Sequence, residues 1–236
     1  EARNTLRAGR SVGLGGTLNL VKTRLTEIRT EQEDLLGEAP LFRYATCNDL
    51  IRLMALHPRY CRVERDSDKS NAWGLKAMGT LFCADRLDRM KPGRALELGA
   101  GWNTHFDKHF GGELEYWMLD DASDIGADQG SRDKFELSLQ KRLHTHFVRG
   151  LLGSPLPELA GEYFDLVFSI SVIEHVPAQS KRDFYREMYR IVKPGGAIAH
   201  SIDIADETLG RAEFEAMKQA GFLLPAHPDL QVRVRP

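Results

Sequence analysis

The sequence predicts an α/β fold, in which a doubly wound and mostly parallel sheet is covered by helices and preceded by an N-terminal helical extension. A buried apolar strand at 94–98 ends in a glycine-rich turn, Gly99-Ala100-Gly101, which opens a helix. A second strand at 115–119 ends in two acids, at the spacing of a βαβ unit, and another strand, helix and strand come after it. This alternation of strands and helices is typical of a parallel sheet.

The glycine turn is the first candidate binding element. Gly99 and Gly101 allow a tight turn and a close backbone approach that a side chain would block. The backbone N–H groups that open the following helix are free donors for a ligand carboxylate or phosphate. The motif departs from the dinucleotide fingerprint G-x-G-x-x-G, because Thr104 stands at its sixth position. The turn therefore indicates a nucleotide-like cofactor only together with the second strand and its terminal acids.

The second strand ends in Asp120-Asp121. A carboxylate at this point, about twenty residues beyond the glycines, can accept hydrogen bonds from both ribose hydroxyls of an adenosine. The alternative is a solvated acid that caps the next element. The sequence does not show which of the two aspartates points toward a ligand.

The second half of the chain continues the pattern. A strand at 163–171 precedes Ile173-Glu174-His175, and an amphipathic helix comes next, with Phe184, Met188 and Ile191 at helical spacing. The residues Lys193-Pro194-Gly195-Gly196 suit a type II turn. We therefore expect a reversal there between the helix and a last strand at 197–202, with one more helix at 211–220.

Residues 1–70 are predicted to form the helical extension, and residues 71–236 the α/β domain. A helix at 17–36 has apolar residues at alternating spacings of three and four, over fewer than three heptads. We expect this face to pack on the α/β domain; the alternative is a short coiled coil that forms a homodimer through these residues. Further helices are expected at 48–56 and 71–90. The extension is expected to cover the site that binds the substrate, and its candidate substrate contacts are Tyr60, Arg62 and Trp73.

Composition limits the function classes. With 236 residues, of which 42% are hydrophobic and 28% charged, the chain can bury one full core. A net charge of -2 and a pI near 6.5 give no electrostatic footprint for nucleic acid. No secretory or membrane-spanning segment is expected, and three scattered cysteines suit a reducing compartment, so we expect a cytoplasmic protein.

The order L-E-L-G-A-G, L-D-D, F-D-L-V-F-S-I-S-V-I-E-H-V and K-P-G-G-A-I-A-H resembles the class I S-adenosylmethionine-dependent methyltransferases over roughly residues 70–236. The resemblance implies a Rossmann-like fold, S-adenosyl-L-methionine as cofactor and methyl transfer as the reaction. Asn103 stands where members usually carry a third glycine, and no acid follows the third strand, so adenine recognition is expected from backbone groups and apolar packing. The cofactor residues implied are Glu97, Gly99, Ala100, Gly101, Asp120, Asp121, Leu151, Leu152 and Ser169.

Methyl transfer requires the acceptor to be held behind the methyl group, so orientation carries most of the rate. A hydroxyl acceptor must also lose its proton to a base. His175 is the candidate base because it follows the fourth strand, where open α/β sheets place their ligands; a polar helix-start residue is the alternative. Glu174 either orients the base or the acceptor, or caps the helix. We therefore expect O-methylation of a small molecule or a glycan.

Other functions remain open from sequence. One is N-methylation of a small amine or a protein side chain, which needs no strong base. Another is a methyltransferase-fold subunit that binds without turnover, and a nicotinamide dehydrogenase is the weakest alternative. Glu174, His175 and Asp203 could hold a divalent ion, but no spacing demands a metal, and none is expected. The pair His105 and His109 is interpreted as solvated or core histidines.

Overall fold

The structure is a computed structural model that describes residues 42, 45, 47–58, 75–101, 106, 114–123, 129–140, 145–153, 156–203 and 207–226. Several predictions fall outside these ranges, namely the helix at 17–36 with its homodimer, the substrate contacts Tyr60, Arg62 and Trp73, and the pair His105 and His109. They stay predictions.

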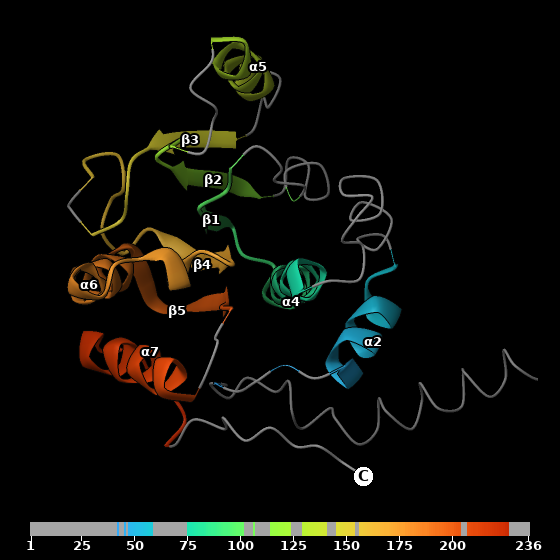
Figure 1. Ribbon diagram of the computed structural model, residues 1–236, viewed down its shortest axis with the longest axis vertical. Helices are drawn as coiled ribbons and strands as arrows, with labels where there is room; N and C mark the ends of the chain where they lie inside the picture. The colour runs from blue at the N-terminus through green and yellow to red at the C-terminus, as the bar shows by residue number, and fades with distance from the viewer. Residues whose placement is uncertain are drawn as a thin grey trace, which may run out of the picture.

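Five parallel strands form one sheet in the order β3-β2-β1-β4-β5 (Figure 1). Their bounds are β1 Arg94–Leu98, β2 Glu115–Asp120, β3 Thr145–Arg149, β4 Phe164–Ile170 and β5 Val192–Ser201. The central strands are short apolar runs because both faces of the sheet are covered. The predicted α/β class is confirmed, and the strands predicted at 94–98, 115–119 and 163–171 are found as β1, β2 and β4, each within one residue of its predicted ends.

Helices cover both faces, as a doubly wound fold requires. One face carries α4 (Leu75–Met90), and α5 (Gln129–Gln140) contacts β3 through Phe135 and Phe147, whose ring centroids are 5.2 Å apart. The opposite face carries α6 (Lys181–Ile191) and α7 (Glu207–Ala220), which lie together on the other side of the sheet from α4 in Figure 1. Two separate apolar cores result, one on each face.

Helix α2 (Cys47–Leu56) packs on α4. Leu53 is buried in the same core as the apolar face of α4, and the ring of His57, just after α2, is held between two carboxylates of α4. Nε2 lies 3.0 Å from an oxygen of Asp85, and Nδ1 lies 3.0 Å from an oxygen of Asp88. This part of the predicted extension is thus continuous with the packing of the α/β domain.

The predicted boundary between helix α6 and the last strand is wrong. Strand β5 begins at Val192, immediately after the helix, rather than at 197. Val192 pairs with Phe164 and Ala197 pairs with Leu166, so residues 193–196 bulge out of the strand register. Gly195 has a φ of +80°, which is the conformation expected of a glycine in a type II turn, but the reversal lies inside the strand.

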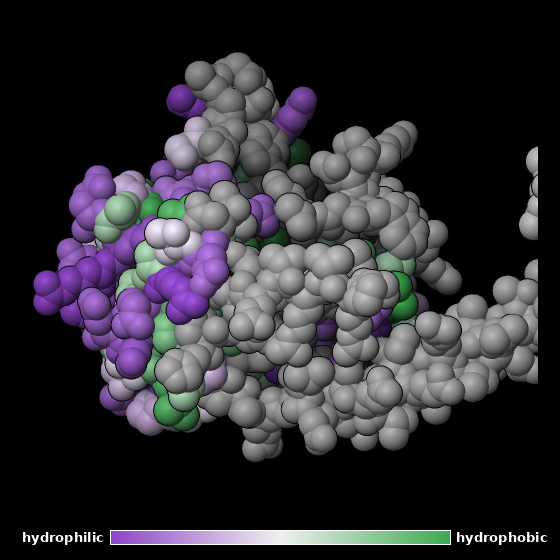
Figure 2. All heavy atoms as spheres, turned by 60° about the horizontal axis from the view of Figure 1, so that its bottom comes forward, coloured by the Kyte–Doolittle hydropathy of each residue, from purple (hydrophilic) through white to green (hydrophobic). Residues whose placement is uncertain are grey.

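The amphipathic character of α6 is confirmed, because Phe184, Met188 and Ile191 are buried while its outer face is charged. Figure 2 shows hydrophilic residues gathered on the side of the molecule that carries α6 and α7. Within the described ranges, no helix combines the length and the apolar content needed to cross a membrane.

Candidate functional site

The site lies at the carboxyl edge of the sheet, between β1 and β4. From β1 the chain builds outward through β2 and β3, whereas β4 and β5 lie on the other side of β1. This reversal of direction makes a topological switch point, which is where open α/β sheets leave a crevice for ligands. The glycine turn after β1 and the turn 171–175 after β4 both lie at this edge.

Different structural features favour glycine at the two positions, 99 and 101, of the first turn. Gly99 has a φ of +61°, and a Cβ placed on it would lie 2.5 Å from Cγ2 of Val172. Gly101 has a φ of +53°, and a Cβ there would meet no atom of the described residues within 4 Å. The turn after β4 therefore packs directly against Gly99, whereas none of the described residues packs against Gly101. Ala100, between them, is buried.

Asp120 connects the tip of β2 to the glycine turn. Its Oδ2 accepts a hydrogen bond of 2.9 Å from the N–H of Gly101, and its Oδ1 accepts one of 2.7 Å from the N–H of Ala122. Asp121 instead accepts a bond of 2.9 Å from the N–H of Ser123, inside its own turn. Each carboxylate oxygen has two lone pairs, so Asp120 keeps acceptor capacity for a ligand beside the glycine turn.

The remaining predicted cofactor residues divide into two groups. Leu151 and Leu152 follow β3 at the same edge; Leu151 is 69% exposed and Leu152 is buried. Glu97 and Ser169 are buried within the sheet. These four assignments stay predictions.

The polar groups of the two buried residues are bonded inside the protein. Tyr116 donates its hydroxyl proton to Glu97, and the hydroxyl of Ser169 lies 2.8 Å from Nδ1 of His200. Burial lowers the pKa of His200 to about 3, so its imidazole is neutral. The structure therefore gives Glu97 and Ser169 partners within the core.

The turn after β4 concentrates unsatisfied polar groups. Ser171 has a φ of +52°, which is a strained backbone conformation for a residue other than glycine. Among the described residues, its hydroxyl and both carboxylate oxygens of Glu174 are buried without a side-chain hydrogen-bond partner. Such orphaned groups are rare in folded proteins, and strained backbone gathers at functional sites. Strain and unsatisfied polarity thus coincide at the switch point.

Glu174 and His175 lie side by side in a short 3-10 helix, η4 (Ile173–His175), but in different surroundings. Burial, together with the Asp203 carboxylate nearby, raises the pKa of Glu174, although its own backbone N–H, the N–H of Asp203 and His175 favour the charged form. His175 is exposed, and its backbone N–H bonds to the carbonyl of Val172 at 3.0 Å. The imidazole is therefore the accessible member of the pair.

The same edge carries the residues of the divalent-ion alternative. Among the residues that the structure describes, no group of three or more His, Cys, Asp and Glu side chains is arranged to hold a metal ion, and Glu174, His175 and Asp203 do not form one. The arrangement of these three side chains lends no support to a metal centre.

Three further polar residues, Lys181, Tyr185 and Glu213, contact one another where α6 packs on α7. No motif in the sequence indicates them. The ammonium of Lys181 contacts Oε1 of Glu213, and the hydroxyl of Tyr185 donates a bond of 2.6 Å to Oε2 of the same carboxylate. Burial raises the pKa of Tyr185, and the charge of Glu174 adds to this effect. Lys181 and Tyr185 lie on α6 and Glu213 lies on α7, so the packing of α6 on α7 brings Glu213 to the other two residues.

Residues 108–200 match a family model described as a methyltransferase domain. The chain is similar in structure to the PH0226 protein from Pyrococcus horikoshii, at 19% identity and a TM-score of 0.44, over 72% of each chain. It is also similar to the glycopeptide N-methyltransferase MtfA, solved with sinefungin, at 20% identity and a TM-score of 0.39, over 51% of this chain and 52% of that one.

A third similar structure is a protein described as a putative sarcosine dimethylglycine methyltransferase from Galdieria sulphuraria, at 16% identity and a TM-score of 0.43. This match covers 58% of the present chain and 57% of that one. The chain thus spans a little over half the length of two of these three structures. No curated protein matches the sequence.

Proposed function

Because the chain belongs to the class I S-adenosylmethionine-dependent methyltransferases, we propose that it methylates an oxygen atom of a small molecule or a glycan, with His175 as the base. One observation carries the proposal. The exposed imidazole of His175 stands in the turn after β4, and Val172 of that turn packs against Gly99 of the cofactor turn. The candidate base therefore lies in a turn that packs against the cofactor turn, at the switch point of the sheet.

The residues at the edge fit the cofactor, S-adenosyl-L-methionine. None of the described residues comes within 4 Å of the position that a side chain on Gly101 would take. Asp120 offers acceptor capacity for ribose hydroxyls, and the exposed side chain of Leu151 offers an apolar surface for an adenine ring. When bound, the cofactor supplies a methyl group on a positively charged sulfur.

The chain's own residues have two tasks in such a reaction. The packing of Val172 on Gly99 fixes the acceptor side of the site relative to the cofactor side, so that binding already supplies much of the orientation. His175 is accessible and takes the proton that a hydroxyl acceptor must lose. The carboxyl group of Glu174 adjoins His175 in the short helix η4 and can help to orient the base or the acceptor.

The test begins by finding the acceptor. The protein is incubated with methyl-labelled cofactor and an extract of its source, and the labelled product is identified by mass spectrometry. We then expect His175→Ala to lower turnover by about 10²–10⁴-fold, while calorimetric affinity for S-adenosylhomocysteine stays nearly unchanged. His146→Ala is the matched control, because this exposed histidine lies in β3, away from the turn after β4.

Each other outcome has its own reading. Turnover that survives His175→Ala would favour an amine acceptor, since a neutral amine attacks without a base. Loss of turnover on treatment with EDTA, with recovery on addition of magnesium or manganese, would favour a metal-assisted reaction. Cofactor binding without any labelled product would identify a binding subunit.

A further inference from the structure

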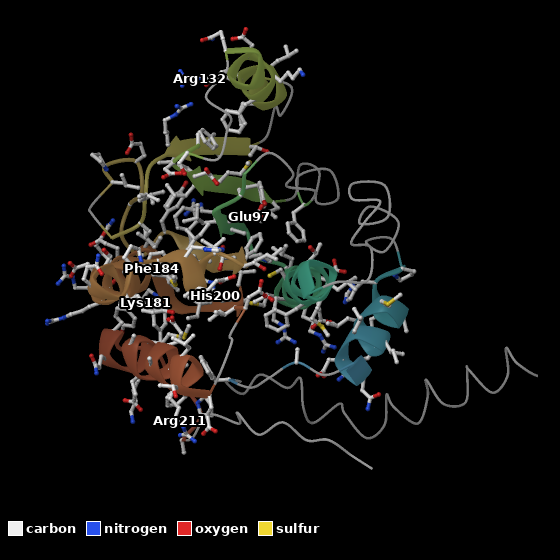
Figure 3. The ribbon with its side chains drawn as sticks, viewed as in Figure 1. Glu97, Arg132, Lys181, Phe184, His200 and Arg211 are labelled. Carbon is white, nitrogen blue, oxygen red and sulfur yellow. The ribbon has the colours of Figure 1, made fainter. Side chains whose placement is uncertain are left out.

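Two buried carboxylates and one ammonium group lie between the turn after β4 and the helices α6 and α7. The carboxylates belong to Glu174, in η4, and to Glu213, which is 3% exposed on α7. The ammonium belongs to Lys181, at the start of α6, and Figure 3 places this residue on the side of α6 that faces α7. One positive charge thus stands beside two carboxylates.

The positive charge is bound to Glu213. Lys181 contacts Oε1 of that carboxylate, and Tyr185 donates its hydroxyl proton to Oε2 at 2.6 Å. Both oxygens of Glu213 are therefore satisfied. Among the described residues, neither oxygen of Glu174 has a side-chain hydrogen-bond partner, although both are buried, and the backbone N–H groups of Glu174 and Asp203 favour its charged form. The ammonium of Lys181 is therefore paired with Glu213 of α7, and Glu174 lacks the positive partner that would stabilise its buried negative charge.

The other charged groups around Glu174 do not replace this ammonium. Asp203, after β5, adds a second negative charge, whereas His175 and the backbone N–H groups of Glu174 and Asp203 act in the opposite direction. Burial is the largest influence on Glu174 and raises its pKa. Glu174 also acts on Lys181: burial lowers the pKa of Lys181, and the negative charge of Glu174 raises it. The two groups are close enough to interact without being bonded.

We propose that Glu213 is a positioning residue that controls the protonation of Glu174 by holding the ammonium of Lys181 on α7. While Lys181 is held there, Glu174 keeps its proton to a higher pH and presents a neutral side chain beside His175. When Glu213 no longer holds it, the ammonium is free to pair with Glu174 and to stabilise its charge. The consequence for turnover rests on the proposed function, whereas the effect on Glu174 itself does not.

The experiment titrates Glu174 directly. Carboxyl carbons of glutamate are labelled with carbon-13, and the Glu174 signal is identified by its loss in Glu174→Gln. Glu213→Gln keeps the shape of the side chain but removes its charge, and we expect it to lower the titration midpoint of Glu174 by about one pH unit or more. Lys181→Gln removes the ammonium and should raise the midpoint.

Two further variants sharpen the result. The double variant Lys181→Gln with Glu213→Gln removes one charge of each sign, so its midpoint should return close to that of the unmodified protein. Glu207→Gln is the matched control, because it removes the same charge from an exposed position on α7, where Glu207 pairs with Arg211. This control should leave the titration of Glu174 unchanged.

The opposite shifts in the two single variants, reversed in the double variant, support the proposal. A midpoint that Glu213→Gln leaves unchanged, or moves no more than Glu207→Gln does, overturns it and leaves Lys181 and Glu213 as a structural link between α6 and α7. If Glu213→Gln does not fold, Lys181→Gln and the double variant decide by the same criterion. Absence of methyl transfer would contradict the proposed function alone, because the titration does not depend on turnover.

Discussion

The glycine turn shows how differently two neighbouring glycines can act. Both have left-handed backbone, which costs other residues about 1–2 kcal/mol. Among the described residues, a Cβ on Gly99 would overlap Val172, whereas a Cβ on Gly101 would meet no neighbour. The missing side chain of Gly99 is needed for packing within the protein, whereas that of Gly101 is proposed to leave space for the cofactor.

This difference predicts separate consequences of the two alanine variants. Gly99→Ala should lower the free energy of unfolding by more than the backbone cost alone, and Val172→Ala in the same chain should recover part of the loss. Gly101→Ala should cost about 1–2 kcal/mol of stability from its backbone alone, and should also weaken cofactor binding. Denaturant unfolding and calorimetry with S-adenosylhomocysteine measure the two effects. Additive losses in the Gly99 and Val172 variants would show that the two residues do not press on each other.

The two aspartates after β2 are expected to differ in the same way. Asp120 bonds to the glycine turn, so Asp120→Ala should reduce cofactor affinity by about 1.5–3 kcal/mol, the range for hydrogen bonds to a charged group. Asp121→Ala is the control, because Asp121 bonds only within its own turn among the described contacts, and it should change affinity little. Calorimetry on the folded variants provides the comparison. Equal losses at the two positions would place the ribose contact elsewhere.

At this scale the sequence indicated candidate segments for the site, but not the burial or the contacts of the residues within them. The motif after β4 indicated Glu174 and His175 together, yet only the structure separates a buried carboxylate from an exposed imidazole. Likewise, nothing in Asp120-Asp121 shows which side chain reaches the glycine turn. Burial and orientation depend on partners from other elements, and these partners are not neighbours in sequence.

At the scale of elements, an ionic contact holds α2 against α4. Asp85 is 1% exposed and would have a raised pKa from burial alone, but hydrogen bonds from His57 and Arg89 outweigh this, and its pKa is lowered to about 2. The ring of His57 lies between the Asp85 and Asp88 carboxylates of α4, with each ring nitrogen 3.0 Å from one carboxylate oxygen. The helix contact is therefore centred on the buried carboxylate of Asp85.

This contact predicts a defined dependence of stability on pH. Because the pKa of Asp85 is lower in the folded protein, its contribution is fully present above the unfolded value near 4 and is lost as the pH falls toward about 2. Asp85→Asn should cost about 2–4 kcal/mol at pH 7, and the difference from the unmodified protein should shrink below pH 4. Denaturant unfolding at several pH values measures it. A constant difference across this range would contradict the assignment.

The predicted elements succeeded where the pattern is local. Short apolar runs predicted β1, β2 and β4, and the spacing of Phe184, Met188 and Ile191 predicted α6. The bulge at 193–196 escaped prediction because it depends on pairing with β4, where Val192 meets Phe164 and Ala197 meets Leu166. A proline and two glycines indicate a reversal, but they do not show that the strand has already begun.

At the scale of the whole molecule, strand order creates the site. The switch between β1 and β4 brings together the glycine turn and the turn after β4, which are about seventy residues apart in sequence. The resemblance of the sequence to a known family implied this topology, and the five parallel strands confirm it. The contacts among Lys181, Tyr185 and Glu213 form only where α6 packs on α7, so they could not be expected from the order of strands alone.

Because Cys83 is buried between α4 and the sheet, the rate at which its thiol reacts can report how often α4 separates from the sheet. This thiol of α4 is fully buried, and its sulfur lies 3.8 Å from the carbonyl oxygens of Ser169 and Ala199 in the sheet. Burial raises its pKa well above the usual value, so an alkylating reagent should modify it only after α4 separates from the sheet. Peptide mass spectrometry at Cys83 measures that rate. Because a ligand of the folded state slows opening by mass action, S-adenosylhomocysteine should slow the alkylation, and candidate acceptors could be screened in this way before any product is known.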